Sequence, residues 1–132
     1  FFWNTYRAMK HDAKCVFEVW NSIPVRAIRN KPMSHISTTH YGDIYIDRER
    51  GFRLTDNSTK TIAEVNYRYR VHTPKGSLTY EDIHIMRAFT LDEITNFLKN
   101  NGLRILNVFA NSAREPFTEN SNKMLIVFEK DK

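Results

Sequence analysis

The segment Arg87-Ala-Phe-Thr-Leu-Asp-Glu-Ile94 decides the fold, because it specifies how one helix begins. Thr90 can act as the N-cap with Glu93 three residues on, which is a capping box. Phe89 and Ile94 flank this box as a hydrophobic staple. The segment therefore predicts a helix that begins directly after Thr90.

The end of this helix is equally well marked. Gly102 follows Asn101 at the position where a left-handed residue ends a helix, and Leu103 can pack back across it. Two apolar strands are predicted next, at 104–109 and 123–129, separated by a polar loop. A helix followed by two closing strands is typical of the last part of an α/β domain.

Upstream, residues 1–10 carry aromatic side chains at helical spacing and predict the end of a helix. The short β-rich run Cys15-Val-Phe-Glu-Val-Trp20 predicts a parallel strand buried on both faces. Such a strand needs neighbours on both edges. The segment 21–41 has no clean periodicity and is predicted as loop with one helical turn.

From residue 41 the pattern changes to antiparallel strands. Ile44 and Ile46 alternate with polar residues until Arg50-Gly51, which we expect to interrupt the strand. Asp56-Asn57-Ser58 predicts a turn. Thr73-Pro-Lys-Gly76 predicts a tight turn that joins a long strand to a second one at 77–86.

The long strand before that turn alternates strictly. One parity is apolar or aromatic and predicts a core face: Ala63, Val65, Tyr67, Tyr69 and Val71. The other parity is polar and predicts a solvated face: Glu64, Asn66, Arg68, Arg70 and His72.

The composition predicts one folded domain over residues 1–132, since 41% of the chain is hydrophobic and 13% aromatic. No apolar run approaches the roughly 20 residues of a membrane helix. Cys15 is the single cysteine, which excludes an intramolecular disulfide. We expect a soluble, cytoplasmic protein with no membrane partner. The net charge of +5 permits an anionic partner without requiring one.

In this order, the segments resemble the C-terminal half of a class I S-adenosylmethionine-dependent methyltransferase of the small-molecule, amino-sugar type. Glu18-Val-Trp-Asn21 resembles the end of that family's fifth parallel strand. His84-Ile-Met-Arg87 resembles the end of its hairpin strand, and Phe89-Thr-x-x-Glu-Ile with Gly102-Leu103 resembles the helix that follows.

The resemblance implies an α/β fold: a partial, Rossmann-like class I methyltransferase sheet with a C-terminal antiparallel hairpin and an inserted antiparallel β lid. The fifth-strand region would be 14–21, the lid 41–88, and the terminal helix and hairpin 89–132. The intact enzyme would use S-adenosyl-L-methionine to methylate a small-molecule acceptor.

The chain departs from the family in its glycines. A Gly-x-Gly-x-x-Gly turn lets the backbone approach such a cofactor. The four glycines here are isolated: Gly42, Gly51, Gly76 and Gly102. We therefore expect a missing N-terminal half that holds the cofactor, and no cofactor binding by this chain alone. The edge of the strand at 14–20 would be left open, so we also expect self-association.

Five residues are candidates for the site. His84 is the catalytic candidate, because imidazole titrates near neutrality and can serve as a base. Trp20 and Asn21 lie where open α/β sheets build ligand crevices. With Tyr67 and Arg87 they are the candidates for substrate binding. A structural histidine, a core tryptophan and a packing role for Arg87 remain open alternatives.

The alternative function is a basic, β-rich nucleic-acid-binding module built on Tyr67-Arg-Tyr-Arg70. Alternation places these tyrosines and arginines on opposite faces, so we do not expect a nucleic-acid partner. A small β-rich binding protein with a closed sheet is a further alternative. His35 and His40 stand in an irregular segment, so we predict no metal site there. No Gly-x-Ser-x-Gly elbow supports serine hydrolase chemistry.

Overall fold

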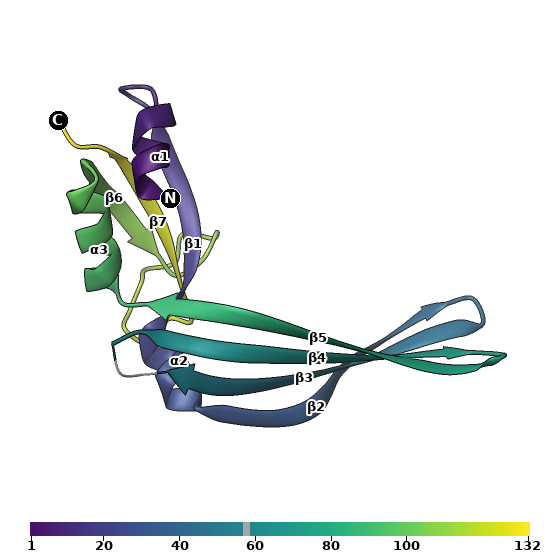
Figure 1. Cartoon of the computed structure of the whole chain (residues 1–132). Coiled ribbons are helices and arrows are strands. Elements are labelled where there is room, and N and C mark those ends of the chain that lie inside the picture. Colours follow the sequence, from purple (N-terminus) through teal and green to yellow (C-terminus); the bar gives the residue numbers. More distant parts are fainter. Residues whose placement is uncertain (57–58) are drawn as a thin grey trace. The chain divides into compact units, whose positions relative to one another are not determined.

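The computed structural model describes residues 1–56 and 59–132. Within these residues, three helices and seven strands follow one another (Figure 1): α1 (Phe2–Ala8), β1 (Lys14–Asn21), α2 (Ser22–Ile28), β2 (Asn30–Tyr41), β3 (Ile44–Asp56), β4 (Thr61–Thr73), β5 (Gly76–Phe89), α3 (Leu91–Asn100), β6 (Leu103–Phe109) and β7 (Lys123–Lys130). The fold class is mixed α/β, as predicted. The expected turn at Asp56-Asn57-Ser58 falls partly outside the described residues.

The chain divides into two compact units, Phe1–Ala27 with Ala88–Lys132, and Ile28–Arg87. The first unit is built on a sheet in which β7 lies between β1 and β6 and is antiparallel to both. β1 and β7 pair from Lys14↔Glu129 to Trp20↔Lys123. The last two residues of β5 also belong to this unit, and they run parallel to the end of β1.

The predicted helix 91–100 is confirmed, with its start and its stop. The Thr90 hydroxyl accepts from the Glu93 backbone N–H at 3.1 Å, and the Glu93 carboxylate accepts from the Thr90 N–H at 3.3 Å. Gly102 has φ +72, which is the left-handed conformation expected there. Gly102 also lies close to Tyr6, because a Cβ at this position would be 3.1 Å from the tyrosine ring.

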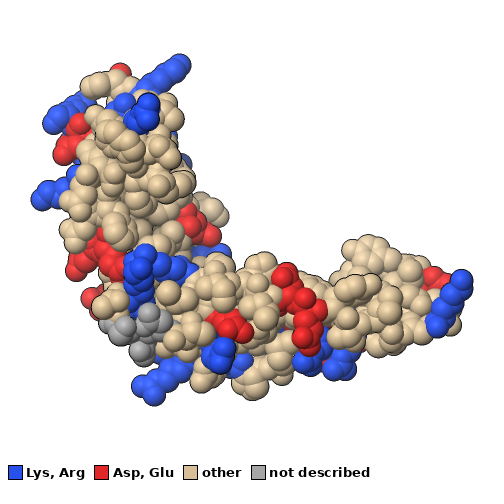
Figure 2. Space-filling model, viewed as in Figure 1, with Lys and Arg blue, Asp and Glu red and all other residues tan. Residues whose placement is uncertain are grey.

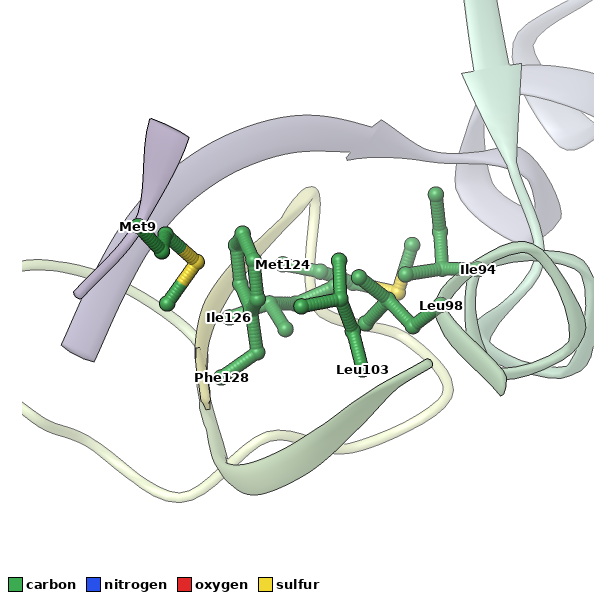
Figure 3. Close-up of a cluster of buried hydrophobic side chains, with 7 residues drawn as sticks. All are labelled: Met9, Ile94, Leu98, Leu103, Met124, Ile126 and Phe128. Atoms are coloured by element: carbon green, nitrogen blue, oxygen red, sulfur yellow. The ribbon is translucent and has the colours of Figure 1, made fainter. Parts of the chain in front are cut away.

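The core of the first unit lies on one face of its sheet. Figure 3 shows the seven buried side chains, which come from α3, β6, β7 and the end of α1: Met9, Ile94, Leu98, Leu103, Met124, Ile126 and Phe128. Phe2 of α1 stacks on Phe97 of α3, so both helices pack on the same face. Alternation along β7 explains this core, since every second residue from Met124 to Phe128 is buried.

The prediction that β1 is buried on both faces is wrong. Cys15, Phe17 and Val19 pack against the core, whereas Lys14, Val16 and Glu18 alternate with them and are exposed. Val16 is 58% exposed. The continuous apolar run does not show this, because Val16 looks like its neighbours in sequence and differs only in the face on which it lies.

The second unit is an antiparallel sheet with strand order β2-β3-β4-β5. Its first strand corrects a prediction, because 30–41 is a strand and not loop, and 22–28 is a helix. The unit spans Ile28–Arg87 and so begins earlier than the expected lid at 41–88. The sequence of β2 shows no regular alternation, because its pairing with β3 shifts register twice between Lys31 and Ser37.

The prediction that Arg50-Gly51 interrupts a strand is wrong. β3 continues through it from Ile44 to Asp56, paired with β4 on one side. A Cβ at this position would lie 2.8 Å from the Met33 sulfur on β2. A side chain at position 51 would require the Met33 side chain to move, so Gly51 favours close packing, which is a common role for glycine within strands. The tight turn at 73–76 is present as predicted and joins β4 to β5.

No helix among the described residues is both long and apolar enough to cross a membrane.

Candidate functional site

Asn21 ends β1 and is 1% exposed. Its Nδ2 donates to the carbonyls of Glu119 and Ser121, at 2.8 Å each. Its Oδ1 accepts from the backbone N–H of Ile23 at 3.4 Å, which places Asn21 as the cap of α2. The amide group is thus engaged by the chain itself, and this favours a structural role over the predicted contact with substrate.

Trp20 lies between two strands, opposite Ala88 on one side and Lys123 on the other, and is half-buried. It remains at the carboxyl end of β1, as the sequence predicted. Arg87 is also half-buried, but it belongs to the second unit. The predicted site residues therefore fall into two groups, with Trp20 and Asn21 in one unit and Tyr67, His84 and Arg87 in the other.

Tyr67 and His84 contact each other across β4 and β5. Their rings meet edge to face with centroids 5.5 Å apart. Tyr67 also stacks beside Tyr69, two residues along β4, at 6.1 Å. The two predicted residues therefore share one face of the second unit, and this face is our candidate acceptor surface.

His84 has a carboxylate partner. Its Nε2 lies 2.9 Å from Oδ2 of Asp82, and both side chains are about half exposed. A carboxylate at Nε2 accepts the proton of that nitrogen and so leaves Nδ1 with the lone pair. His84 in this arrangement can take a proton from a group that approaches Nδ1.

Arg48 completes the candidate acceptor surface, and the sequence analysis missed it. Its guanidinium lies over the Tyr67 ring, 4.8 Å from the centroid. Strand alternation could have found it, because Arg48 pairs with Tyr69 and so shares the face of Tyr67. Aromatic rings, a guanidinium and an imidazole together suit a polar ring with hydroxyl, amino or anionic substituents.

The opposite face of the same strands is charged and internally paired. Arg68 lies between Glu49 and Glu81, at 3.2 and 3.3 Å, and Arg70 lies 3.8 Å from Glu49. Figure 2 shows acidic and basic side chains interspersed on the face in view. These arginines are neutralised and face away from the tyrosines, which does not favour the nucleic-acid alternative.

His35 and His72 flank one carboxylate, that of Asp47. The Thr38 hydroxyl donates to Asp47 at 2.6 Å, and His72 Nε2 lies 3.0 Å from its other oxygen. Together with His35, these partners lower the pKa of Asp47, with the Thr38 hydrogen bond as the largest cause. Within the described part of the chain, no three histidine, cysteine, aspartate or glutamate side chains are arranged to hold a metal ion.

We compared the chain with known proteins. No protein-family model matches it, and no curated protein does. Several solved structures have the same architecture. An S-adenosylmethionine-dependent methyltransferase from Clostridium acetobutylicum matches with a TM-score of 0.73 at 12% identity, covering 99% of this chain and 50% of that one. The chain has the fold of about half of such a methyltransferase.

Two further methyltransferases agree. An amino pentose methyltransferase from Micromonospora echinaspora, solved with S-adenosylmethionine bound, matches with a TM-score of 0.74 at 13% identity over 98% of this chain and 48% of its own. A sugar N-methyltransferase from a Streptoalloteichus species matches with a TM-score of 0.72 at 11% identity over 99% and 47%. The chain spans about half the length of these methyltransferases, which is consistent with their C-terminal half.

The residues present do not fit the cofactor site of that fold. Such a site needs a glycine-rich turn between a parallel strand and a helix. Gly42 and Gly76 lie at the hairpin turns of the second unit. Gly51 lies inside β3, and Gly102 follows α3. None of the four stands at a strand-to-helix turn.

Proposed function

We propose that this chain is the acceptor-binding part of an S-adenosylmethionine-dependent methyltransferase that acts on a small molecule. The cofactor would be held by residues outside this chain, in the other half of the fold. The matches to methyltransferases over 98–99% of the chain and only 47–50% of their length support both parts of the proposal. A cytoplasmic location belongs to the same proposal.

The single observation that carries the proposal is the outer edge of β1. One edge pairs with β7 along the whole stretch from Lys14 to Trp20. Within residues 1–56 and 59–132, the other edge has a strand partner only at Trp20 and Asn21. Exposed strand edges are normally paired or covered, so the stretch from Lys14 to Val19 is suited to receive another strand.

One face of β1 is exposed, and like the open edge this suits a further part of the fold packed against it. Val16 lies opposite Val127 and shares its face, which is the face away from the core helices. In α/β domains with a parallel sheet, helices cover both faces. A second half of the fold would add a strand at this edge and helices over this face.

Methyl transfer requires an acceptor atom with a lone pair, aligned with the methyl group. In the proposal the cofactor supplies the methyl group, and this chain supplies the alignment. Tyr67 and Arg48 would hold the acceptor ring. His84, with Nε2 engaged by Asp82, would accept at Nδ1 the proton that an amine or hydroxyl acceptor loses.

The proposal is tested by methyl transfer from labelled S-adenosylmethionine to a panel of amino and hydroxy sugars. The polypeptide encoded by the complete reading frame is compared with this chain alone. We expect labelled product only from a polypeptide that carries a glycine-rich strand–turn–helix upstream of these residues. A complete frame without such a segment, or one that transfers no methyl group to any sugar or amine, would overturn the proposal.

A further inference from the structure

His72 joins a serine and an aspartate in the second unit, on the charged face opposite the candidate acceptor surface. Its Nδ1 lies 3.0 Å from Oγ of Ser77, and its Nε2 lies 3.0 Å from Oδ2 of Asp47. The three residues come from β4, β5 and β3, which are neighbours in the sheet (Figure 1). Enzymes activate a serine in this way, with a base in hydrogen-bond reach and a third group that orients the base.

The hydrogen bonds of His72 determine where its protons lie. An ionised carboxylate only accepts hydrogen bonds, so Nε2 of His72 donates to Asp47. In the neutral imidazole the other nitrogen then carries a lone pair, and the Ser77 hydroxyl donates to Nδ1. The proton of Ser77 is therefore directed at His72, which is the arrangement needed when Oγ attacks an electrophile.

Asp47 is itself held in place from β2. The Thr38 hydroxyl donates to Oδ1 of Asp47 at 2.6 Å, and His35 Nε2 lies 2.8 Å from the same hydroxyl oxygen. Because Thr38 has a single hydroxyl proton and uses it on Asp47, His35 is the donor to Thr38. The Thr38 hydrogen bond, followed by His72 and His35, lowers the pKa of Asp47. The carboxylate is therefore ionised at neutral pH.

Tyr45 fixes the plane of the imidazole. It lies directly opposite His72 in the pairing of β3 with β4, and the two rings stack with centroids 4.2 Å apart and planes 13° apart. The side chains of His72 and Asp47 are 26% and 30% exposed, whereas Ser77 is exposed. The base and the carboxylate are thus held within the sheet, and the hydroxyl is open to an approaching electrophile.

A hairpin turn presents Ser77, in place of the strand-to-helix elbow that the sequence lacks. Ser77 follows Gly76, whose φ of +137 is a conformation that favours glycine. The Thr73 hydroxyl donates to the Gly76 carbonyl at 2.9 Å and accepts from the Lys75 N–H at 3.2 Å. These bonds hold the turn at 73–76, and so they hold Ser77 beside the histidine of the neighbouring strand.

We propose that Ser77 is a nucleophile that accepts acyl groups from activated esters, with His72 as its base and Asp47 as the group that orients His72. Oγ of Ser77 attacks the carbonyl carbon, Nδ1 of His72 takes the hydroxyl proton, and the bond to the leaving alkoxide or phenolate breaks. The proton passes from His72 to the leaving oxygen or to water.

Water then attacks the acyl-serine ester, with His72 again as the base. This step releases the carboxylic acid and restores the serine hydroxyl. A positioned base contributes about 10²–10⁴-fold, which suits esters whose leaving group is already good. The activity is independent of the proposed methyl transfer, because no residue of the candidate acceptor surface takes part in it.

Hydrolysis of para-nitrophenyl acetate by the chain tests the activity. We expect a burst of about one equivalent of para-nitrophenolate per chain, followed by slower turnover, since this is the kinetic fingerprint of an acyl-enzyme. Ser77→Ala should abolish the burst, and the fold should be kept because Ser77 is exposed. Ser112→Ala, an exposed serine between β6 and β7, is the matched control and should keep the burst. No burst, or a burst that survives in Ser77→Ala, would overturn the proposal.

Labelling with a fluorophosphonate tests the roles of the three residues. The probe loses fluoride when a serine oxygen attacks its phosphorus, and we expect peptide mass mapping to find the adduct on Ser77. His72→Gln removes the base. Asp47→Asn offers an amide N–H to Nε2 and so leaves the proton on Nδ1. Each should slow labelling about 100-fold in variants that circular dichroism shows to be folded.

His11→Gln is the control for labelling, because His11 also lies beside an aspartate, at 3.3 Å, and should leave the rate unchanged. An adduct on a residue other than Ser77 would contradict the site. So would labelling of Ser77 at the wild-type rate in both His72→Gln and Asp47→Asn, because the serine would then react without its base.

Discussion

Nε2 of His84 lies 2.9 Å from Oδ2 of Asp82, and the two residues are two positions apart on β5. Strand alternation brings them to one face, and the same face carries the Tyr67 ring. A carboxylate that holds Nε2–H fixes the tautomer and leaves Nδ1 as the acceptor of a proton. His72 and His11 also have aspartate partners, at 3.0 and 3.3 Å. His84 is the base in the proposed methyl transfer because, of these three, it is the one whose ring contacts Tyr67.

His84→Gln is predicted to lower kcat for methyl transfer by about 100-fold, since a positioned base contributes that order of magnitude. The KM for the acceptor should change little, and Asp82→Asn should lower kcat less. Steady-state kinetics on the polypeptide that carries both halves of the fold measures both constants. His11→Gln is the control, because His11 also pairs with a neighbouring aspartate, Asp12, at 3.3 Å. An equal fall in kcat in His84→Gln and His11→Gln would contradict the role of His84 as the base.

Tyr67→Ala is predicted to raise the KM for the acceptor about tenfold, because the ring that contacts both Arg48 and His84 is removed. Tyr67→Phe keeps the ring and should stay near the wild-type value. Tyr41→Ala, an exposed tyrosine on β2, should have no effect. If kcat falls in Tyr67→Ala while KM stays constant, the ring does not bind the acceptor.

Thr90→Ala is predicted to lower the free energy of unfolding by about 1 kcal/mol, which is the usual cost of losing an N-cap. Urea unfolding measures it. Thr95→Ala is the control within α3, because its hydroxyl bonds only the Leu91 carbonyl of the preceding turn. That variant should stay within about 0.5 kcal/mol of wild type. A double mutant with Glu93→Ala should be less destabilised than the sum of the single changes, since both residues form one capping box.

Asp47 is predicted to make stability depend on pH in the acid range. Its pKa in the folded chain is lowered from the ordinary value of an aspartate, chiefly by the Thr38 hydrogen bond and also by His72. The stabilisation is therefore complete above the pKa of Asp47 in the unfolded chain and is lost as the pH falls through its pKa in the folded chain. Asp47→Asn should destabilise the chain at pH 6 and have a smaller effect near pH 3. Asp43→Asn, an exposed residue in the neighbouring turn, serves as the control.

The elements that the sequence predicted best are those specified by local chemistry. Thr90, Glu93 and Gly102 act within one helix, so their roles follow from spacing alone, and the structure confirms them. The turn at 73–76 is equally local, and the prediction that it joins two strands is confirmed, since it lies between β4 and β5.

The parts that were missed depend on contacts between distant segments. β2 has no clean alternation, because its pairing with β3 shifts register twice, and its existence rests on β3 beside it. Gly51 looked like a break because its packing against Met33 cannot be seen locally. Arg48 joined the candidate acceptor surface only once the register of β3 and β4 was known. The hydrogen bonds from the Asn21 amide to the backbone carbonyls of Glu119 and Ser121 also join distant segments, whereas substrate binding by Asn21 stays a prediction.

Calorimetric titration with S-adenosylmethionine tests the central claim most directly. It is performed on this chain and on the polypeptide encoded by the complete reading frame. The account predicts stoichiometric binding by the longer polypeptide and no binding heat from this chain, whose glycines form no cofactor turn. Tight binding by this chain alone, or none by either, would contradict it.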